Sequence, residues 1–501
     1  MAQKKGISDV PEIDLSTYTI DQAAVDLVPA LVSQKYGLIP LFRVGSSLTV
    51  AMSDPSNILA LDELRTITGL DVSVVRSELK LIEEAISEYY GISGVVEEVV
   101  KEYKATVGEA KPKKTQEEAA PIVKLVNVVL TSAVSQRASD IHIEPEAKQV
   151  RVRFRIDGVL HEETTMPSYM IGPIASRVKV LSGMDIAESR LPQDGRFEFS
   201  SMGRSIDLRV SSFPSAYGEK IVLRILDKSA MIYKLSQIGF SEDNLEKFRK
   251  TIQKPHGIIL VTGPTGSGKT TTLYSMLTEL NSSELNIMTV EDPIEYEMDG
   301  ITQAQVNVKA GLTFASALRS ILRQDPDVIL IGEIRDLETA EISIQSSLTG
   351  HLVFSTLHTN DAAGALTRLL DMGVEPFLIS SSVEAILAQR LVRLICKKCK
   401  KEHPAPEMLA AKFPEIRKIH KGEGCKVCKN TGYKGRTGVF ELLLVDEEIR
   451  KMITDKKSAQ EIKKYAVLKG MRTLYEDGMI KVAQGLTSLD EIMRVTELEQ
   501  V

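Results

Sequence analysis

The stretch Ile258-Ile-Leu-Val-Thr-Gly-Pro-Thr-Gly-Ser-Gly-Lys-Thr-Thr271 decides the fold of this chain. It predicts an apolar strand, the Gly-x-x-x-x-Gly-Lys-Thr pattern of a phosphate-binding loop (P-loop), and then a helix that runs from Thr271 to Leu280. The glycines of such a loop let backbone N–H groups turn inward onto a polyphosphate, and the helix N-terminus adds the positive end of its dipole. A chance glycine-rich turn would lack this context. The stretch therefore predicts a nucleoside-triphosphate site.

The residues of the loop have separate expected roles. The side chain of Lys269 would reach the β- and γ-phosphates, and the hydroxyl of Thr270 would bind Mg2+. The residues that we expect to contact ATP are Gly263, Pro264, Thr265, Gly266, Ser267, Gly268, Lys269, Thr270 and Thr271.

Apolar strands alternate with helical segments from residue 255 to about 395, which predicts a doubly wound, mainly parallel α/β sheet. Ligands of such sheets bind at the carboxyl ends of the strands, and each of the next motifs falls at such an end. The expected strands are Ile258–Val261, Ile287–Val290, Val328–Ile331 and Leu352–Ser355.

Acidic residues follow two of these strands. Glu291 and Asp292 come directly after the strand that ends at Val290, and Glu333 follows Gly332 after another strand. In P-loop enzymes the strand beside the loop supplies an acid that binds Mg2+ or orients the attacking water. We expect Glu333 to orient the water, with Glu291 as a second catalytic candidate; the alternative is that Glu333 only caps a helix. Gly332 stands where an Asp is usual, so Thr270, water, Glu291 or Asp292 would have to hold Mg2+.

Two histidines flank the strand Leu352–Ser355. His351 and His358 are seven residues apart, which is not the His-x-x-x-His spacing of a metal site. His358 lies at the carboxyl end, where it could sense the γ-phosphate directly or through water. A structural role is the alternative for both histidines.

The four cysteines form two pairs, Cys396-x-x-Cys399 and Cys425-x-x-Cys428, separated by 25 residues. Four cysteines in a chain of 501 residues do not make a disulfide framework. Two such pairs indicate a tetrahedral, structural four-thiolate zinc site, and a redox pair is the weaker alternative. The cations around the first pair are Arg393, Lys397, Lys398, Lys400 and Lys401.

A second domain is expected before the P-loop domain. Its strand Val150–Ile156 alternates strictly, so its three arginines share one face of the sheet. Two later apolar strands, Ile206–Val210 and Ile221–Ile225, are interrupted by Arg209 and Arg224. A solvated basic face would explain these arginines, but a planar, bidentate cation also suits a phosphate.

Composition and charge narrow the class of protein. With 43% apolar and 26% charged residues, the chain has the composition of an ordinary globular protein. A net charge of −6 and a pI near 5.8 give no general attraction to nucleic acid. Neither a signal peptide nor a membrane span is expected, so we predict a cytoplasmic protein that reaches membranes through a partner.

The sequence predicts six segments in all. They are a recruitment domain (1–95), a flexible linker (96–118), the second domain (119–230), the P-loop domain (231–395), a four-cysteine subdomain (396–430) and a C-terminal helical subdomain (431–501).

Over nearly its whole length, the sequence resembles the secretion ATPase family of type II secretion systems and type IV pilus assembly. The P-loop at 263–270 and the cysteine quartet, which is similar to the family's zinc-binding insert, contribute to this resemblance. The other matching motifs are Ala138-Ser-Asp-Ile-His-Ile-Glu-Pro145, Arg190-Leu-Pro-Gln-Asp-Gly-Arg196, Val290-Glu-Asp-Pro-Ile-Glu295, Asp325-Pro-Asp-Val-Ile-Leu-Ile-Gly-Glu-Ile-Arg-Asp336, Thr349-Gly-His351 and Leu357-His-Thr-Asn360.

The resemblance implies a RecA-like core preceded by a PAS-like domain, assembled as a homohexamer with nucleotide at the cleft between these two domains. It also implies that Arg209 and Arg224 supply cations to the γ-phosphate, and that hydrolysis moves one domain against the other. In this family the motion is thought to turn a membrane platform protein and to add pilin-like subunits to a fibre. The implied cofactors are ATP, Mg2+ and Zn2+. The implied partners are inner-membrane platform and assembly proteins, with anionic lipid as a candidate and no nucleic acid.

Further features bear on the branch of the family. Retraction motors are shorter and lack the extended N-terminal region and the four cysteines. Pilus extension motors often carry an additional domain with an Arg-Leu-Gly-x-x-Leu motif, which this sequence lacks. The segments 370–377 and 435–441 favour the type II secretion branch.

Two other classes of function are alternatives to a motor ATPase. The first is a RecA-like nucleic-acid translocase, which the acidic pI and the lack of an aromatic and basic groove disfavour. The second is a non-catalytic, nucleotide-gated scaffold, against which the intact Lys269, Thr270 and Glu333 argue.

Overall fold

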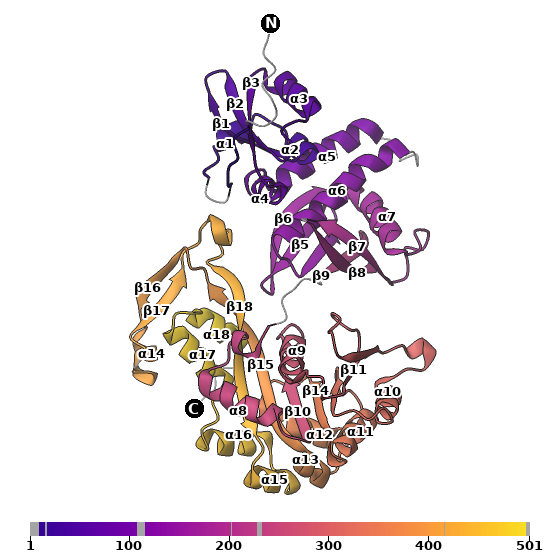
Figure 1. Cartoon of the computed structure of the whole chain (residues 1–501), viewed down its shortest axis with the longest axis vertical. Helices are drawn as coiled ribbons and strands as arrows, with labels where there is room; N and C mark the ends of the chain where they lie inside the picture. The colour runs from indigo at the N-terminus through magenta and orange to yellow at the C-terminus, as the bar shows by residue number, and fades with distance from the viewer. Residues whose placement is uncertain are drawn as a thin grey trace. The chain divides into compact units, whose positions relative to one another are not determined.

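The computed structural model describes residues 10–15, 18–107, 116–201, 203–227, 233–414 and 416–496. The chain divides into two compact units, Met1–Ser229 and Ala230–Val501 (Figure 1). This division lies next to the boundary expected at residue 230. Among the described residues, no helix combines the length and the apolar composition that crossing a bilayer would require.

A small α/β domain opens the first unit. Its sheet has the order β1-β2-β3, with β1 and β2 antiparallel and β2 and β3 parallel. Leu48 and Val50 of β2 pack into one small core and Ala51 into another, so the sheet is covered on both faces. The elements are α1 (Gln22–Val25), α2 (Ala30–Tyr36), β1 (Leu38–Val44), β2 (Ser47–Met52), α3 (Ile58–Thr68), β3 (Asp71–Arg76) and α4 (Leu79–Tyr89).

The expected linker over residues 96–118 differs from the structure. Residues 96–107 belong to helix α5 (Gly91–Val107), which packs on helix α6 (Gln116–Ser135). Val96, Val99 and Tyr103 are buried at the three- and four-residue spacing of one helix face. The charged residues between them hid this stripe in the sequence. Residues 108–115 of the expected linker lie outside the described residues.

An antiparallel six-stranded sheet completes the first unit, in the order β6-β5-β4-β9-β8-β7. Helices α6 and α7 cover one face, where apolar residues such as Val152, Leu208 and Leu223 form the core (Figure 1). The alternate residues, including the arginines of β5, β8 and β9, lie on the opposite face. The elements are β4 (Asp140–Pro145), β5 (Gln149–Ile156), β6 (Val159–Pro167), α7 (Ile171–Ser182), β7 (Gln193–Ser201), β8 (Arg204–Ser215) and β9 (Gly218–Asp227).

The second unit is built on a seven-stranded sheet in the order β12-β11-β13-β14-β10-β15-β18. All neighbours are parallel except β15 and β18, which confirms the predicted doubly wound, mainly parallel sheet. Strand β13 has the predicted bounds, and the other three predicted strands are correct within two residues. The strands are β10 (Gly257–Thr262), β11 (Ile287–Glu291), β12 (Thr302–Gln305), β13 (Val328–Ile331), β14 (Leu352–Leu357), β15 (Val383–Ile395) and β18 (Tyr433–Leu444).

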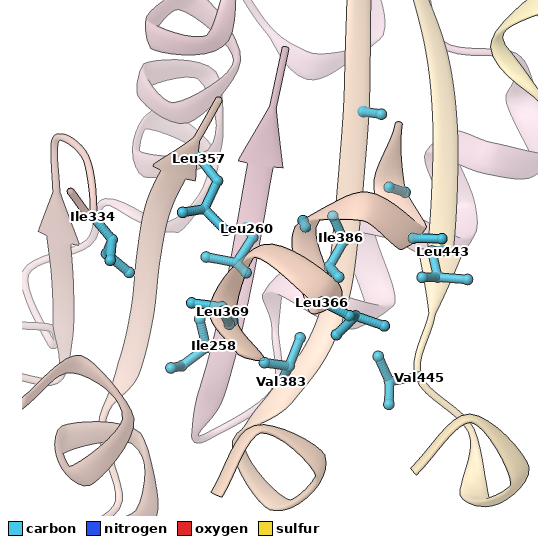
Figure 2. Close-up of a cluster of buried hydrophobic side chains, with 14 of the residues drawn as sticks. Ile258, Leu260, Ile334, Leu357, Leu366, Leu369, Val383, Ile386, Leu443 and Val445 are labelled. Atoms are coloured by element: carbon cyan, nitrogen blue, oxygen red, sulfur yellow. The ribbon is translucent and has the colours of Figure 1, made fainter. Parts of the chain in front are cut away.

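Both faces of this sheet are covered by helices. Figure 2 shows Ile258 and Leu260 of β10 on the side of helix α12 (Ala362–Asp371), whose Leu366 and Leu369 belong to the same core. The alternate side chains of β10 belong to the core that helix α9 (Lys269–Leu280) closes. Burial of each such side chain stabilises the fold by roughly 1.5–3 kcal/mol. Helix α8 (Glu242–Ile252) packs in the same core as α9, and α10 (Phe314–Ile321), α11 (Leu337–Leu348) and α13 (Pro376–Ser382) pack in the same core as α12.

The sequence predicts a helical subdomain over residues 431–501, but the structure shows that this segment also contains a strand. Residues 433–444 form β18, because the buried run Val439–Leu443, which is apolar except for Glu441, completes the edge of the sheet beside β15. The elements of the four-cysteine subdomain lie between β15 and β18: β16 (Lys400–Pro404), α14 (Glu407–Lys412) and β17 (Lys418–Gly422). After β18 come α15 (Glu447–Thr454), α16 (Ala459–Leu468), α17 (Leu474–Ala483) and α18 (Leu489–Val495).

Candidate functional site

The P-loop joins β10 to α9 and lies directly against β15. A Cβ atom at Gly263 would come within 2.5 Å of the backbone oxygen of Gln389, and a Cβ at Gly268 within 2.8 Å of the Gln389 side-chain nitrogen. Both glycines also have φ angles in the left-handed region, at +149° and +90°. Larger residues are therefore excluded at both positions. At Gly266, by contrast, a Cβ would meet open space.

Gln389 holds this loop from the side of the sheet. Its side-chain N–H donates to the carbonyl oxygen of Ser267 at 2.9 Å, and its side-chain oxygen accepts from the Thr272 hydroxyl at 2.7 Å. The sequence analysis missed this residue. The available signal was an amide that follows the apolar run Ala385–Ala388 and precedes Arg390.

Thr262, the residue before the P-loop, is hydrogen-bonded to Thr359 in the segment after β14. The Thr262 hydroxyl oxygen accepts a hydrogen bond from the backbone N–H of Thr359 at 2.9 Å and lies 2.7 Å from the Thr359 hydroxyl. The Arg390 guanidinium donates to the Asn360 carbonyl oxygen at 2.8 Å. The P-loop and the motif that contains His358 are therefore fixed to one another.

Lys269 lies folded onto the P-loop. Its ammonium group donates to the carbonyl oxygens of Gly263 at 2.8 Å and Pro264 at 3.1 Å. Burial lowers the pKa of Lys269, and the nearby Glu333 carboxylate opposes this shift. The lysine thus lies between the P-loop and Glu333, which follows β13, the second strand from β10 in the sheet.

Glu333 lies just after β13. The backbone before it is held by β14, because the Thr356 hydroxyl donates to the carbonyl oxygen of Gly332 at 2.7 Å. Its carboxylate lies 3.3 Å from the Nε2 atom of His358 and forms an ion pair with Arg335. The structure therefore brings Lys269, Glu333 and His358 together. His351 lies at the amino end of β14, and its ring contacts the carbonyl oxygen of Ser346 instead.

Glu291 is buried at the end of β11 and is hydrogen-bonded on both oxygens. One oxygen accepts from the Tyr274 hydroxyl, and the other accepts from Thr289 at 2.6 Å and from Gln303 at 3.1 Å. Burial raises the pKa of Tyr274, so its hydroxyl stays a donor at neutral pH. These partners fix the orientation of Glu291.

Arg209 and Arg224 belong to the first unit, on the sheet face opposite α6 and α7. They are register partners on β8 and β9, so their side chains leave the sheet on the same face. The Nε atom of Arg224 donates to the Asp140 carboxylate at 3.1 Å. Asp140, on β4, is a partner that the sequence analysis did not foresee.

The four cysteine Sγ atoms all lie within 4.8 Å of one another. Neighbouring Sγ atoms are 3.7–3.8 Å apart, which is the edge of a tetrahedron with Zn–S bonds of about 2.3 Å and too long for disulfides. Burial raises the pKa of the Cys428 thiol, but backbone N–H groups of Cys425 and Gly432 outweigh this effect and lower it to about 7. The cluster therefore fits a tetrahedral metal ion. Arg393, expected as a cation beside the cysteines, instead binds Glu491.

Residues 115–494 match the family model described as type II/IV secretion system protein. The chain belongs to this family. Residues 8–95 also match the model of the MshEN domain. The sequence is 44% identical to the type IV pilus assembly ATPase PilB of Myxococcus xanthus, over 97% of this chain and 88% of that protein. It is 53% identical to the type II secretion system ATPase E of Vibrio cholerae, over 76% of each chain.

The fold agrees with this membership of the secretion system family. The structure of the pilus retraction motor PilT with bound ADP has 27% sequence identity and a TM-score of 0.51, over 75% of this chain and 98% of that one. The chain is thus an ATPase of the secretion and pilus assembly family, as its motifs predicted. A nucleic-acid translocase, the alternative kept above, is not supported.

Proposed function

We propose that this chain hydrolyses ATP as the hexameric motor of a type II secretion or type IV pilus assembly machine. The observation that carries the proposal is the meeting of Lys269, Glu333 and His358 at the carboxyl ends of β10, β13 and β14. This edge of a parallel sheet is where a nucleotide binds. The resemblance to secretion and pilus ATPases supplies the assembly role.

The P-loop would bind the phosphates through the backbone N–H groups of Gly263 and of residues 265–271. The Lys269 ammonium would exchange its two carbonyl partners for phosphate oxygens. Thr270 is exposed on the first turn of α9, so its hydroxyl fits a ligand of Mg2+, which neutralises phosphate charge when bound.

Glu333 would orient the attacking water. The Arg335 ion pair and the His358 ring fix its carboxylate near the loop. His358 would then respond to the γ-phosphate through Glu333. Glu291 remains a second candidate acid, since its backbone lies close to Gly332, the residue before Glu333.

Arg209 and Arg224 would act on the γ-phosphate. Their shared sheet face and planar guanidinium groups support this role. The four cysteines would hold one structural Zn2+, since their sulfur separations match a four-thiolate site.

The expected partners are inner-membrane platform and assembly proteins, with anionic lipid as a further candidate. The names of the relatives support a place in such a machine. We propose that the protein works on the cytoplasmic side of the inner membrane, to which the N-terminal domain recruits it. Both branches of the family remain open, although segments 370–377 and 435–441 favour type II secretion.

Exchange of Glu333 tests the hydrolytic site. Glu333→Gln keeps the size of the side chain and removes its charge, so ATP should still bind while turnover falls by roughly 10²-fold or more. Lys269→Ala should lose both binding and turnover, because it removes the phosphate contact itself. Steady-state ATPase rates and the binding of a fluorescent ATP analogue would be measured for both variants.

The matched control is Glu338→Gln, on the first turn of α11 outside the loop edge, which should behave as wild type. If the Glu333→Gln variant turns over at a near-normal rate, the catalytic role moves to Glu291.

A further inference from the structure

Gln389 is a polar side chain in the middle of a buried strand. It is 2% exposed and lies on β15, yet both of its hydrogen bonds go to the P-loop and the helix after it rather than to the sheet. A buried amide is stable only when its polar atoms are paired, and here the donor reaches Ser267 and the acceptor receives Thr272. The side chain therefore connects the sheet to the nucleotide loop.

The orientation of the peptide group between Ser267 and Gly268 decides whether its N–H or its carbonyl oxygen faces a bound anion. Its carbonyl oxygen is bound to Gln389, and the N–H of a trans peptide points opposite to the carbonyl. The N–H of Gly268 is thus directed away from β15. A P-loop binds phosphate through such backbone N–H groups.

A flip of this peptide would reverse the charge that it offers to a phosphate. Glycine adopts φ angles of either sign with little steric penalty, so Gly268 on one side of the peptide does not resist such a rotation. The flipped peptide would turn a carbonyl oxygen toward the phosphate and would leave the Gln389 amide without an acceptor. The hydrogen bond from Gln389 opposes this rotation.

We propose that Gln389 is a positioning residue that holds the Ser267–Gly268 peptide with its N–H toward the nucleotide phosphates. The inference rests on the proposed nucleotide binding at the P-loop. It requires an amide: a carboxylate at this position would lose the donor and would repel both the Ser267 carbonyl oxygen and the phosphates.

Two substitutions at Gln389 in the full chain test this role. Gln389→Met keeps the length of the side chain and removes both hydrogen bonds, whereas Gln389→Glu keeps only the acceptor for Thr272. Since only molecules with the unflipped peptide would bind nucleotide, the affinity for fluorescent ADP should fall by about tenfold in Gln389→Met and by more in Gln389→Glu, whose charge also repels the phosphates. The KM for ATP should rise by a similar factor while kcat changes less.

Two further variants separate positioning from support of the fold. Thr272→Val removes the other hydrogen bond to the same amide and should leave ADP affinity near the wild-type value. Gln345→Met makes the same chemical change on the exposed face of α11 and should bind ADP as wild type does. Melting temperatures without nucleotide would be recorded for all variants.

Wild-type ADP affinity in both Gln389 variants, with or without a lower melting temperature, would overturn the inference. An equal loss of affinity in Thr272→Val would do the same, since the bond to Ser267 would then not be decisive. ADP binding is measured without turnover, so a chain that binds ADP through Gln389 but fails to hydrolyse ATP would contradict only the proposed function.

Discussion

The proposed role of Arg209 and Arg224, contact with the γ-phosphate, depends on the charge and the planar shape of their guanidinium groups. The sequence places both among apolar neighbours, but strand alternation puts them on the face away from the core, and Arg224 is 55% exposed with Asp140 as its partner. The fold thus tolerates both charges without a nucleotide. Because the partner Asp140 is buried, loss of Arg224 would also break this ion pair, so the melting temperature of each variant is to be measured beside its activity.

Each arginine should matter for turnover more than for ADP binding. A cation at the γ-phosphate acts mainly while charge shifts in the transition state, so Arg209→Ala and Arg224→Ala should each lower kcat while ADP affinity changes little. A lysine should restore little activity, because it lacks the planar fork of the guanidinium group. Steady-state ATPase rates beside ADP titrations provide the measurement.

Arg204→Ala offers the control, since this exposed arginine lies at the start of the same strand. Wild-type turnover in both test variants, or a loss of ADP affinity equal to the loss of turnover, would contradict the assignment.

Site residues that are positioned by local sequence could be predicted, whereas those that act through long-range contacts could not. Lys269 and Glu333 can be predicted as site residues from the sequence. Each follows a strand whose carboxyl end lies at the nucleotide edge of the sheet, so the local sequence fixes its position. Gln389 acts on a residue 122 positions away, and Asp140 binds an arginine 84 positions away. Such contacts depend on strand order, which a single sequence does not specify.

Elements were predictable where one periodicity dominates. Strand β13 has the predicted bounds, since it is a clean apolar run. The sequence predicts a linker over residues 96–107 of helix α5, because the buried residues of this helix are separated by charges. It predicts a helical segment where strand β18 lies, because β18 pairs with β15 across a whole inserted subdomain.

Helix α18 is joined to β15 by one buried carboxylate. Glu491 accepts hydrogen bonds from the guanidinium groups of Arg393 and Arg494 and from the backbone N–H of Arg393. Burial alone would raise the pKa of Glu491, but these donors outweigh it and lower the pKa to about 2. The ionised form is therefore the one that holds the helix.

This junction should give the second unit an acid-sensitive step in stability. A carboxyl group with a depressed folded-state pKa contributes stability that is complete above its unfolded pKa of about 4.5 and is lost as the pH falls toward 2. Glu491→Gln should lower the free energy of unfolding at pH 7, and the difference from wild type should shrink as the pH falls below 4.5. Urea unfolding at several pH values would measure it.

Glu448→Gln, on the exposed side of α15, is the control and should show no such pH-dependent difference. A Glu491→Gln deficit that stays constant between pH 7 and pH 3 would show that the charge is not what holds α18.

At the scale of the whole molecule, the stability of the four-cysteine subdomain should depend on a bound metal ion. The described residues between the cysteine pairs form only the short pair β16–β17 and helix α14, so metal binding should supply much of the folding free energy of this subdomain. A chelator under mild denaturant should release about one Zn2+ per chain and lower the melting temperature. Metal analysis and calorimetry would follow both.

Cys399→Ser should reproduce the lower melting temperature without chelator, whereas wild-type protein reloaded with Zn2+ should recover. A metal-free preparation with unchanged stability and unchanged assembly would exclude a structural metal at this site.

The two ends of the four-cysteine subdomain meet on one strand pair, because Ile395 of β15 and Tyr433 of β18 are register partners. A segment that leaves and re-enters a sheet at the same rung can be lengthened, shortened or exchanged without disturbing the strands that carry it. Replacement of residues 396–432 by a two-residue hairpin turn should keep β15 and β18 in register, but it would uncover the apolar surface on which Ile416 and Ile419 pack. Since Ile416 and Ile419 belong to the core of the second unit, the inserted segment can change freely only at residues that face away from that core.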